Sequence, residues 1–579
     1  MSTSNEGSKE SSEPNRTGER DDRSMDSFSE VSSFPGSEAY AINPIRENES
    51  NDLENSRTIS RRISRRTSVS QSFRLLAREI TDPKTIDEKL YDEEDLPKMG
   101  SGKKIPPVPA DEREYLVTFD MPDDPALPHN WSIYKKILLT SLVTTFSFCN
   151  SLGSALLSQS SEEIMKKFRI GREVATLATS LYVLGFAWGP ILWGPLSEIY
   201  GRKSVFVPAT LGYTCFSYAV ATAENVQTIM ICRFFCGFFG ASSMVLSSAT
   251  IADLFSSEFR GRAMAPFGVS VCGGPTLAPI ISGFTAKNSH LSWRWNAYWN
   301  SFIGSVIFVL MVFFFEETYH PVILVKKASQ LRKMTGNWGI HCEHENLSLS
   351  FRDICVKFIA RPVLMLFMEP IVFLIAVYGA FVYGLIYLLL EAIPLIFTNN
   401  YKFSLGVGEL PYISVFIGVL IGGGILTLAD VRYRRLATGG KRLPRERLPA
   451  MMVGGFCISI GMFWLTWSGD YPQHVHWIVP TIGGAFVGAG FLTVFQPCIN
   501  YIVDSYLAFA ASAVTAITIL RSIFGGVFPL FSYPMFTKML IKYAGTLIGC
   551  VSVLLIPVPF IFYHFDGKLR KKSYFILRS

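Results

Sequence analysis

The chain is 579 residues long, 49% of its residues are hydrophobic, 13% are aromatic, and its formal net charge is +7. Its many apolar runs exclude a water-soluble globular fold, because runs of about 20 apolar residues match a bilayer core of about 30 Å. The basic residues lie between these runs, where membrane topology accounts for them, so the charge does not indicate a nucleic-acid partner. The sequence therefore predicts an all-α membrane protein with many spans.

Residues 1–134 are polar and rich in Ser, Glu, Arg and Pro. They bury too little apolar surface to offset chain entropy, so we expect a disordered cytosolic tail. No cleavable signal peptide is expected, because the first apolar run begins near Ile137. The basic, hydroxyl-rich stretch 61–68 is expected to bind anionic membrane lipids and to be released when a kinase phosphorylates Ser64 or Ser68. The alternative is a solvated tail without this role.

Twelve spans are predicted, six on each side of a polar loop. This divides the chain into a tail at 1–134, a first six-helix bundle at 135–315, a central loop at 316–369 with room for an amphipathic helix, a second bundle at 370–565 and a tail at 566–579. Lys and Arg are more than twice as frequent in one set of connections as in the other, which predicts that both termini are cytosolic. The predicted spans are 135–157, 174–197, 204–223, 227–251, 263–284, 296–315, 370–397, 409–429, 449–467, 477–503, 510–536 and 545–564.

The two halves carry a faint internal repeat. The fifth span contains Gly273-Gly274-Pro275 and Pro279, and the eleventh contains Gly525-Gly526 and Pro529. Helices interrupted by Gly and Pro at matching places in two halves indicate a transporter built from repeats.

Three stretches resemble one family of carriers. Residues 194–203 (GPLSEIYGRK) are similar to the loop between spans two and three of the major facilitator superfamily, with Glu198 where Asp is commoner. Residues 233–241 (RFFCGFFGA) resemble its fourth-span pattern, with Cys236 where Gln is usual. The fifth span resembles its antiporter motif, although Ala278 and Ser282 replace two glycines. The antiporter-like positions are Gly268, Gly273, Gly274, Pro275 and Pro279.

Other stretches, such as 293–296 (WRWN), 391–394 (EAIP) and 500–506 (NYIVDSY), resemble the fungal twelve-span drug:proton antiporters, which include polyamine exporters and azole-resistance pumps. The resemblance covers about residues 115–570. It implies two pseudo-symmetric six-helix bundles that rock to open a central cavity to one side at a time.

An inner gate is predicted at the cytosolic ends of the second and fourth spans. Glu198 can face the partly positive start of the eleventh helix, and Arg202 can reach Asp253. Lys203 belongs to the same turn, and Asp504 is expected to act similarly in the second half. The alternative is a topology signal that only keeps this loop inside.

Glu391, Arg233 and Arg521 are the strongest ionisable candidates within the predicted spans, where a charge costs several kcal/mol unless it is paired or hydrated. We interpret Glu391 as the carboxylate for which protons and cationic substrates compete. Arg233 is predicted to hold Glu391 or another acid in one gate state, and Arg521 to take part in coupling or substrate binding. For each of them, a packing role is the alternative. Weaker candidates for the cavity wall are Asn150, Gln159, Tyr378, Tyr383, Tyr387, Gln496 and Asn500.

The sequence predicts a transporter, not an enzyme, that exports cationic or amphipathic small molecules in exchange for protons. It lacks a phosphate-binding loop, so the proton gradient is expected to drive transport without a cofactor. His341-Cys342-Glu343-His344-Glu345 match no zinc pattern, and no metal is expected. We expect a monomer, and the resemblance implies the plasma membrane, with the vacuolar membrane as the alternative. Proton-coupled nutrient uptake and a non-transporting sensor remain alternative functions.

Overall fold

The computed structural model describes residue 99 and residues 114–120, 124–256, 259–288, 290–346, 360–437, 444–506 and 509–573. Within these ranges, twelve helices are long and apolar enough to cross a membrane, and each coincides with one predicted span. The protein is therefore a multi-pass membrane protein. The first-half helices are α2 (Ile133–Ala155), α4 (Arg172–Tyr200), α5 (Arg202–Thr222), α6 (Val226–Leu254), α7 (Arg260–Lys287) and α8 (Arg294–Phe314). The second-half helices are α12 (Pro370–Pro394), α13 (Tyr412–Ala437), α14 (Leu448–Gly469), α15 (Ile478–Ser505), α16 (Ala510–Met539) and the joined pair α17 (Ile541–Leu555) and α18 (Pro557–Lys572).

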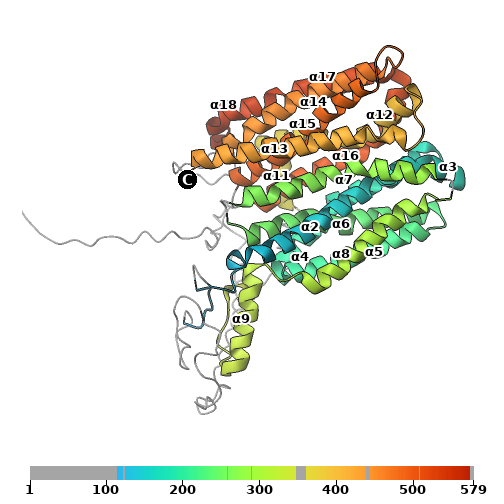
Figure 1. Cartoon of the computed structure of the whole chain (residues 1–579). Helices are drawn as coiled ribbons and strands as arrows, with labels where there is room; N and C mark the ends of the chain where they lie inside the picture. The colour runs from blue at the N-terminus through green and yellow to red at the C-terminus, as the bar shows by residue number, and fades with distance from the viewer. Residues whose placement is uncertain are drawn as a thin grey trace, which may run out of the picture. The chain divides into compact units, whose positions relative to one another are not determined.

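Each half forms one bundle, and the two bundles repeat the same packing (Figure 1). In the first half α4 packs on α6, α5 packs on α6 and α8, and α2 packs on α7. The equivalent pairs of the second half are α13 with α15, α14 with α15 and α17, and α12 with α16. This pseudo-symmetry confirms the predicted fold of two six-helix bundles.

The bundles meet along two equivalent helix pairs, α4 with α16 and α7 with α13. Small residues allow the backbones to come close, which favours van der Waals packing where lipid supplies no hydrophobic drive. A Cβ atom added to Gly526 of α16 would lie 3.1 Å from the carbonyl oxygen of Ser180 in α4. One added to Gly273 of α7 would lie 2.7 Å from the ring of Phe416 in α13.

A small second core lies beside the first bundle. It is built on α9 (His320–Thr335), a helix at the start of the central loop. The core residues come from three parts of the chain: Met99, Tyr115, Val117, Ala328, Leu331 and Ile340.

This small core corrects the predicted extent of the disordered tail. Residues 114–120 and 124–134 were expected to be disordered, yet Leu116 pairs with His341, and Lys327 of α9 lies 3.1 Å from the carboxylate of Asp124. Apolar residues such as Tyr115, Val117 and Leu127 are frequent in this segment, but they form no run long enough for a span, and the segment was therefore grouped with the polar tail. Most of the predicted tail, with Ser64 and Ser68, lies outside the described residues, as do residues 347–359 of the central loop.

The two ends of the bundles differ in the short helices that they carry. The end with α9 is called the inner end, and the end with the short helix α3 (Ser161–Phe168) is called the outer end (Figure 1).

Candidate functional site

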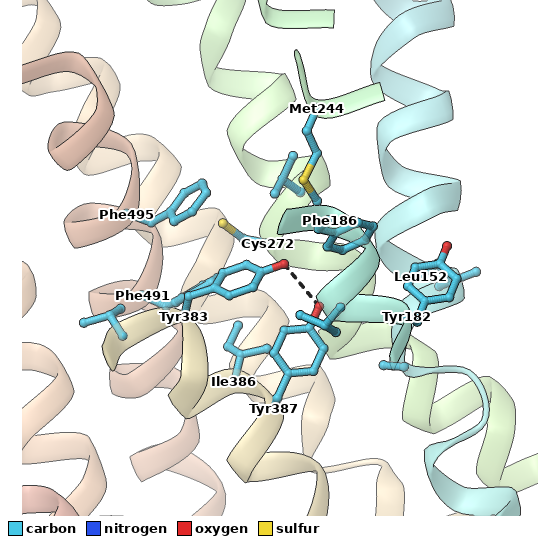
Figure 2. Packing of buried hydrophobic residues seen from close by; sticks show 14 of the residues in the cluster. Leu152, Tyr182, Phe186, Met244, Cys272, Tyr383, Ile386, Tyr387, Phe491 and Phe495 are labelled. Atoms are coloured by element: carbon cyan, nitrogen blue, oxygen red, sulfur yellow. Dashed lines mark hydrogen bonds between the residues drawn. The ribbon is translucent and has the colours of Figure 1, made fainter. Parts of the chain in front are cut away.

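The centre of the bundle interface is lined by aromatic side chains from both halves. Tyr383 and Tyr387 of α12 share a hydrogen bond of 3.2 Å, and the Tyr387 hydroxyl lies 3.0 Å from that of Ser154 in α2. Figure 2 shows this tyrosine pair between Phe491 and Phe495 on one side and first-bundle side chains on the other. The two tyrosines, which the sequence placed on the cavity wall, therefore lie where the bundles meet.

Arg233 of α6 is held entirely by its own bundle. Its guanidinium donates to the backbone oxygens of Ala178, Gly153 and Ser154 at 2.8–3.0 Å and lies 4.3 Å from the ring centroid of Tyr182. The side chain is 4% exposed. In this state Arg233 ties α6 to α2 and α4 and does not pair with Glu391.

Arg521 of α16 is buried with far fewer partners. Its Nη2 lies 3.5 Å from the sulfur of Met244 in the first bundle, and its Nε has no hydrogen-bond partner within the described residues. The guanidinium lies 5.4 Å from the ring of Tyr383 and 5.0 Å from that of Phe495. An incompletely paired cation among aromatic rings at the bundle interface is suited to contact a solute there.

Glu391 is paired across the bundle interface near the outer end. Its Oε2 accepts a hydrogen bond of 3.0 Å from Arg172, the first residue of α4, and its side chain is 9% exposed. The Arg172 guanidinium also stacks 3.5 Å from the ring centroid of Tyr533 in α16. Nearby, Gln159 donates weakly to the backbone oxygen of Leu390 at 3.4 Å. These contacts hold the outer ends of the two bundles together.

At the inner end of the first bundle, Arg202 binds the charged residues of the predicted gate. Its Nε donates to Asp253 at 3.0 Å and its Nη1 donates to Ser197 at 2.6 Å. Glu198 is half-buried within electrostatic range of both Arg202 and Asp253. Residues 507–508, which precede α16, lie outside the described part, so a contact between Glu198 and the start of α16 stays a prediction.

Glu317 completes this cluster and was not predicted from the sequence. Its carboxylate accepts the backbone N–H groups of Arg202 at 2.7 Å and Lys203 at 3.0 Å, the first two residues of α5. It also accepts from Thr318 and Tyr319. Burial and the nearby Glu198 raise the pKa of Tyr319 to about 12, so its ring stays neutral beside Arg202. Glu317 thus caps the partly positive N-terminus of α5.

The second bundle has an equivalent cluster around Arg447. The Arg447 guanidinium donates to Asp504 at 3.0 Å and to Asp430 at 3.2 Å, and it stacks 3.8 Å from the Tyr433 ring. The Asp430 carboxylate also lies directly against Gly261 at the start of α7, across the bundle interface. Asp504, proposed from the sequence, is therefore part of a charged cluster. Aligning the two halves would have added Asp430 at the position of Glu198 and Arg447 at that of Arg202.

The antiporter-like glycines face three different neighbours. Gly274 packs against the backbone of Leu152 in α2, within the first bundle. Gly273 faces Phe416 and Gly268 faces Gln496, both in the second bundle. Pro275 and Pro279 lie inside α7, where neighbouring helices can compensate for the lost backbone hydrogen bonds.

Four weaker candidates have different surroundings. Asn150 is buried inside the first bundle, where its amide oxygen accepts from Tyr182 at 2.8 Å. Tyr378 is directed toward Gly455 inside the second bundle and away from the bundle interface. Gln496 lies at the interface and donates to Asn500 at 3.5 Å.

Arg172 was the main omission from the sequence-based site. The signal for it was the group of basic residues in the first outer loop, which fits the positive-inside rule poorly. One of these residues neutralises Glu391, so its position reflects an ion pair and not topology.

Two pseudo-symmetric bundles, with an ion pair across their interface at the outer end and a charged cluster in each bundle at the inner end, define a membrane transporter built from repeats. Residues 143–529 match the model of the Major Facilitator Superfamily, and the chain belongs to this superfamily.

Relatives and solved structures agree with this assignment. The chain is 51% identical to the Major facilitator superfamily multidrug transporter FLU1 of Candida albicans, over 90% of this chain and 84% of that protein. It is 44% identical to the multidrug transporter TPO1_2 of Candida glabrata, over 86% of each. The fold is similar to that of the xylose transporter XylE from E. coli, with a TM-score of 0.52 and 17% identity over 75% of this chain and 98% of that one.

Proposed function

We propose that the protein exports cationic or amphipathic small molecules, such as polyamines and antifungal drugs, in exchange for protons. The observation that carries the proposal is the Arg172–Glu391 ion pair, which joins the two bundles near the outer end. A carboxylate that must leave its partner when the bundles separate is suited to gain a proton at that step. The names of the relatives, both multidrug transporters, support the substrate class.

The pair suggests an order of events in which the outer end faces the outside of the cell. Substrate enters from the cytosol while the pair holds the outer end closed. Rocking of the bundles separates Arg172 from Glu391, and the exposed carboxylate takes a proton from the acidic outside while substrate leaves. The neutral acid is buried again at little cost. Loss of the proton to the inside then restores the ion pair.

The central aromatic residues suit flat or cationic solutes. Tyr383, Tyr387 and Phe495 offer ring faces, which attract organic cations and apolar rings. Arg521 lies among the same rings and would favour solutes that carry an acceptor group. This combination supports transport of amphipathic molecules with varied structures.

The direct test is transport by the purified full-length chain in liposomes. Spermine and the fluorescent dye rhodamine 6G would serve as probes, with the proton gradient imposed in either direction. Antiport predicts that each probe accumulates in the compartment from which protons leave. Accumulation in the direction of proton flow would instead establish uptake by symport. Absence of movement by folded protein would favour a sensor.

Two variants make the test specific for the ion pair. Glu391→Gln should lose gradient-driven accumulation by about tenfold or more while still exchanging probe at equilibrium. Glu224→Gln, which changes an exposed acid at the outer end, is the matched control and should behave as the unmodified protein. Full accumulation by Glu391→Gln would rule out Glu391 as the proton site.

In the cell, the proposed carrier has a defined orientation, membrane and mode of regulation. The distribution of Lys and Arg supports an orientation with both termini in the cytosol. We place the carrier in the plasma membrane as a monomer that contacts membrane lipids and needs no cofactor. A kinase that phosphorylates Ser64 or Ser68 would regulate it through the tail.

A further inference from the structure

A second buried acid lies close to Glu391 and was not identified from the sequence. Glu409 ends the short turn Val407–Glu409 before α13 and is 1% exposed. One of its carboxylate oxygens, Oε2, has no hydrogen-bond partner within the described residues. Glu409 and Glu391 lie within electrostatic range of each other.

Among the described residues, no cation forms an ion pair with Glu409, and the neighbouring Glu391 is paired with Arg172. The turn packs against α7, α12 and the helical turn Leu395–Asn400. Of the ionisable groups on these elements and beside them, Glu391 pairs with Arg172, and Lys287 donates to the Ser404 hydroxyl. The Tyr412 hydroxyl donates to the backbone oxygen of Leu389, and the Tyr401 hydroxyl donates to that of Val475. Lys402 is exposed.

The charges therefore do not balance when both acids are ionised. Glu391 already holds the Arg172 guanidinium, so an ionised Glu409, which is 1% exposed, would carry an uncompensated negative charge. An uncompensated buried charge is unfavourable, and a bound proton removes it.

The chain packs closely around the Glu409 side chain. We use the name outer seam for the contact of Gly283 and Phe284 in α7 with Gly406 and Glu409. A Cβ atom added to Gly283 would lie 2.6 Å from Cγ of Glu409, and one added to Gly406 would lie 3.1 Å from the Phe284 ring. The chain is therefore closely packed against the Glu409 side chain, and a proton adds no volume to this contact.

We propose that Glu409 and Glu391 form a proton-binding site in which Glu409 carries a proton whenever the outer seam is closed and Glu391 is ionised. The proton comes from the external solution: the Glu409 carboxylate becomes a carboxylic acid as the seam closes and releases the same proton when the seam opens. External acid therefore stabilises the closed seam. This proposal deepens the proposed function, because it assigns a second acid to the site of Glu391.

The test measures the seam directly and does not depend on transport. Spin labels would be attached at Asn288→Cys, beyond the end of α7, and at Asn399→Cys, before the seam turn. Both residues are exposed and uncharged. The distance between the labels would be measured by electron paramagnetic resonance, with the full-length chain in lipid nanodiscs between pH 5 and pH 8. The unmodified site should shift from shorter to longer distances as the pH rises.

Two variants at the site and one control decide the outcome. Glu409→Gln should keep the short distance at every pH, and Glu391→Gln should also lose the pH response because Arg172 is then free to neutralise Glu409. Glu224→Gln should respond as the unmodified site does. A distance that does not change with pH, or a response that survives in Glu409→Gln, would overturn the proposal.

A second comparison separates the proton from a metal cation. At pH 8, replacing choline chloride with sodium chloride should leave the distance unchanged, and shortening by sodium would overturn the proton assignment.

The pH response of the label distance is independent of the transport test. A pH response lost in Glu409→Gln, without movement of spermine or dye, would support the proton site and reject the proposed function. Transport without a pH response at the seam would support the proposed function and reject the proton site.

Discussion

Arg202 and Arg447 occupy equivalent positions in the two halves of the protein. Arg202 begins α5, Arg447 immediately precedes α14, and each binds the aspartate near the end of the fourth span of its own half, Asp253 or Asp504, at 3.0 Å. The cluster around Arg202 includes the superfamily motif at residues 194–203, whereas the sequence around Arg447 has little similarity to that motif. The repeated geometry indicates that both clusters serve the inner end of the carrier.

Replacing Arg447 should therefore impair transport as strongly as replacing Arg202. We expect Arg447→Ala to lower the rate of dye transport by about tenfold or more, because two partly buried carboxylates lose their common cation. Arg447→Lys should recover only part of the rate, since an ammonium group lacks the fork that binds two carboxylates. Arg445→Ala is the control, because the Arg445 side chain is 45% exposed and pairs only with the adjacent Glu446 among the described acids. Normal transport by Arg447→Ala would show that the second cluster does not act in the cycle.

Loss of the buried Arg233 should affect folding, whereas loss of the buried Arg521 should affect transport. Arg233→Met leaves three backbone oxygens without their donor, each at a cost of about 1–3 kcal/mol, and should reduce the yield of folded protein. Arg521→Met removes a cation that is incompletely paired, so folding should persist while transport falls about tenfold or more. Size-exclusion profiles and dye transport, measured on the same preparations, separate the two effects. Equal loss of folded protein in both variants would contradict this division.

The neighbouring glycines of α7 should also be distinguishable. An added Cβ at Gly274 would lie 2.6 Å from the backbone nitrogen of Leu152, which cannot move aside. Gly274→Ala should therefore destabilise the first bundle by about 1–3 kcal/mol and lower its thermal stability in detergent.

At Gly273 the obstacle is the Phe416 ring of the other bundle, which can rotate. Gly273→Ala should fold normally and change the rate of transport instead. If Gly273→Ala lowers thermal stability as much as Gly274→Ala does, the distinction between the two contacts is wrong.

The inner end should loosen in mild acid. His129 and His320 have ring centroids 5.1 Å apart; burial lowers the pKa of His129, as does the nearby His320. Burial also lowers the pKa of His320 and outweighs the hydrogen bond to the backbone oxygen of Asp253. A histidine in an unfolded chain titrates near pH 6.5, so the unfolded state binds protons first as the pH falls. The stability from these neutral rings is present above about pH 6.5 and is lost as the pH drops through their folded-state values.

Thermal melting between pH 7.5 and pH 5 measures this effect. The His320→Gln variant should lose less stability on acidification than the unmodified protein. The exposed His290 provides the control, and His290→Gln should melt as the unmodified protein does at each pH. The same acid sensitivity in His320→Gln would exclude the histidine pair as its source.

The spans and the first inner-gate contacts could be predicted because they depend on local pattern. Apolar runs of sufficient length define the helices, and the Arg202–Asp253 pair follows from residues at the inner ends of two helices in the first bundle. The Arg172–Glu391 pair joins residues 219 positions apart, and no local feature specifies that contact. Glu409 was overlooked because it lies at the edge of a predicted span, where a charge is usually hydrated. Its burial results from two glycines that bring the chain close on either side.

The carboxylate of Glu317 mechanically couples the central loop to one half of the carrier. Four backbone N–H groups fix it to the start of α5 and to the chain that leads into α9. In the rocking motion proposed above, α9 and the small core around it move together with the first half. A protein that binds this small core and also the second half would slow the motion without contacting the aromatic residues at the bundle interface.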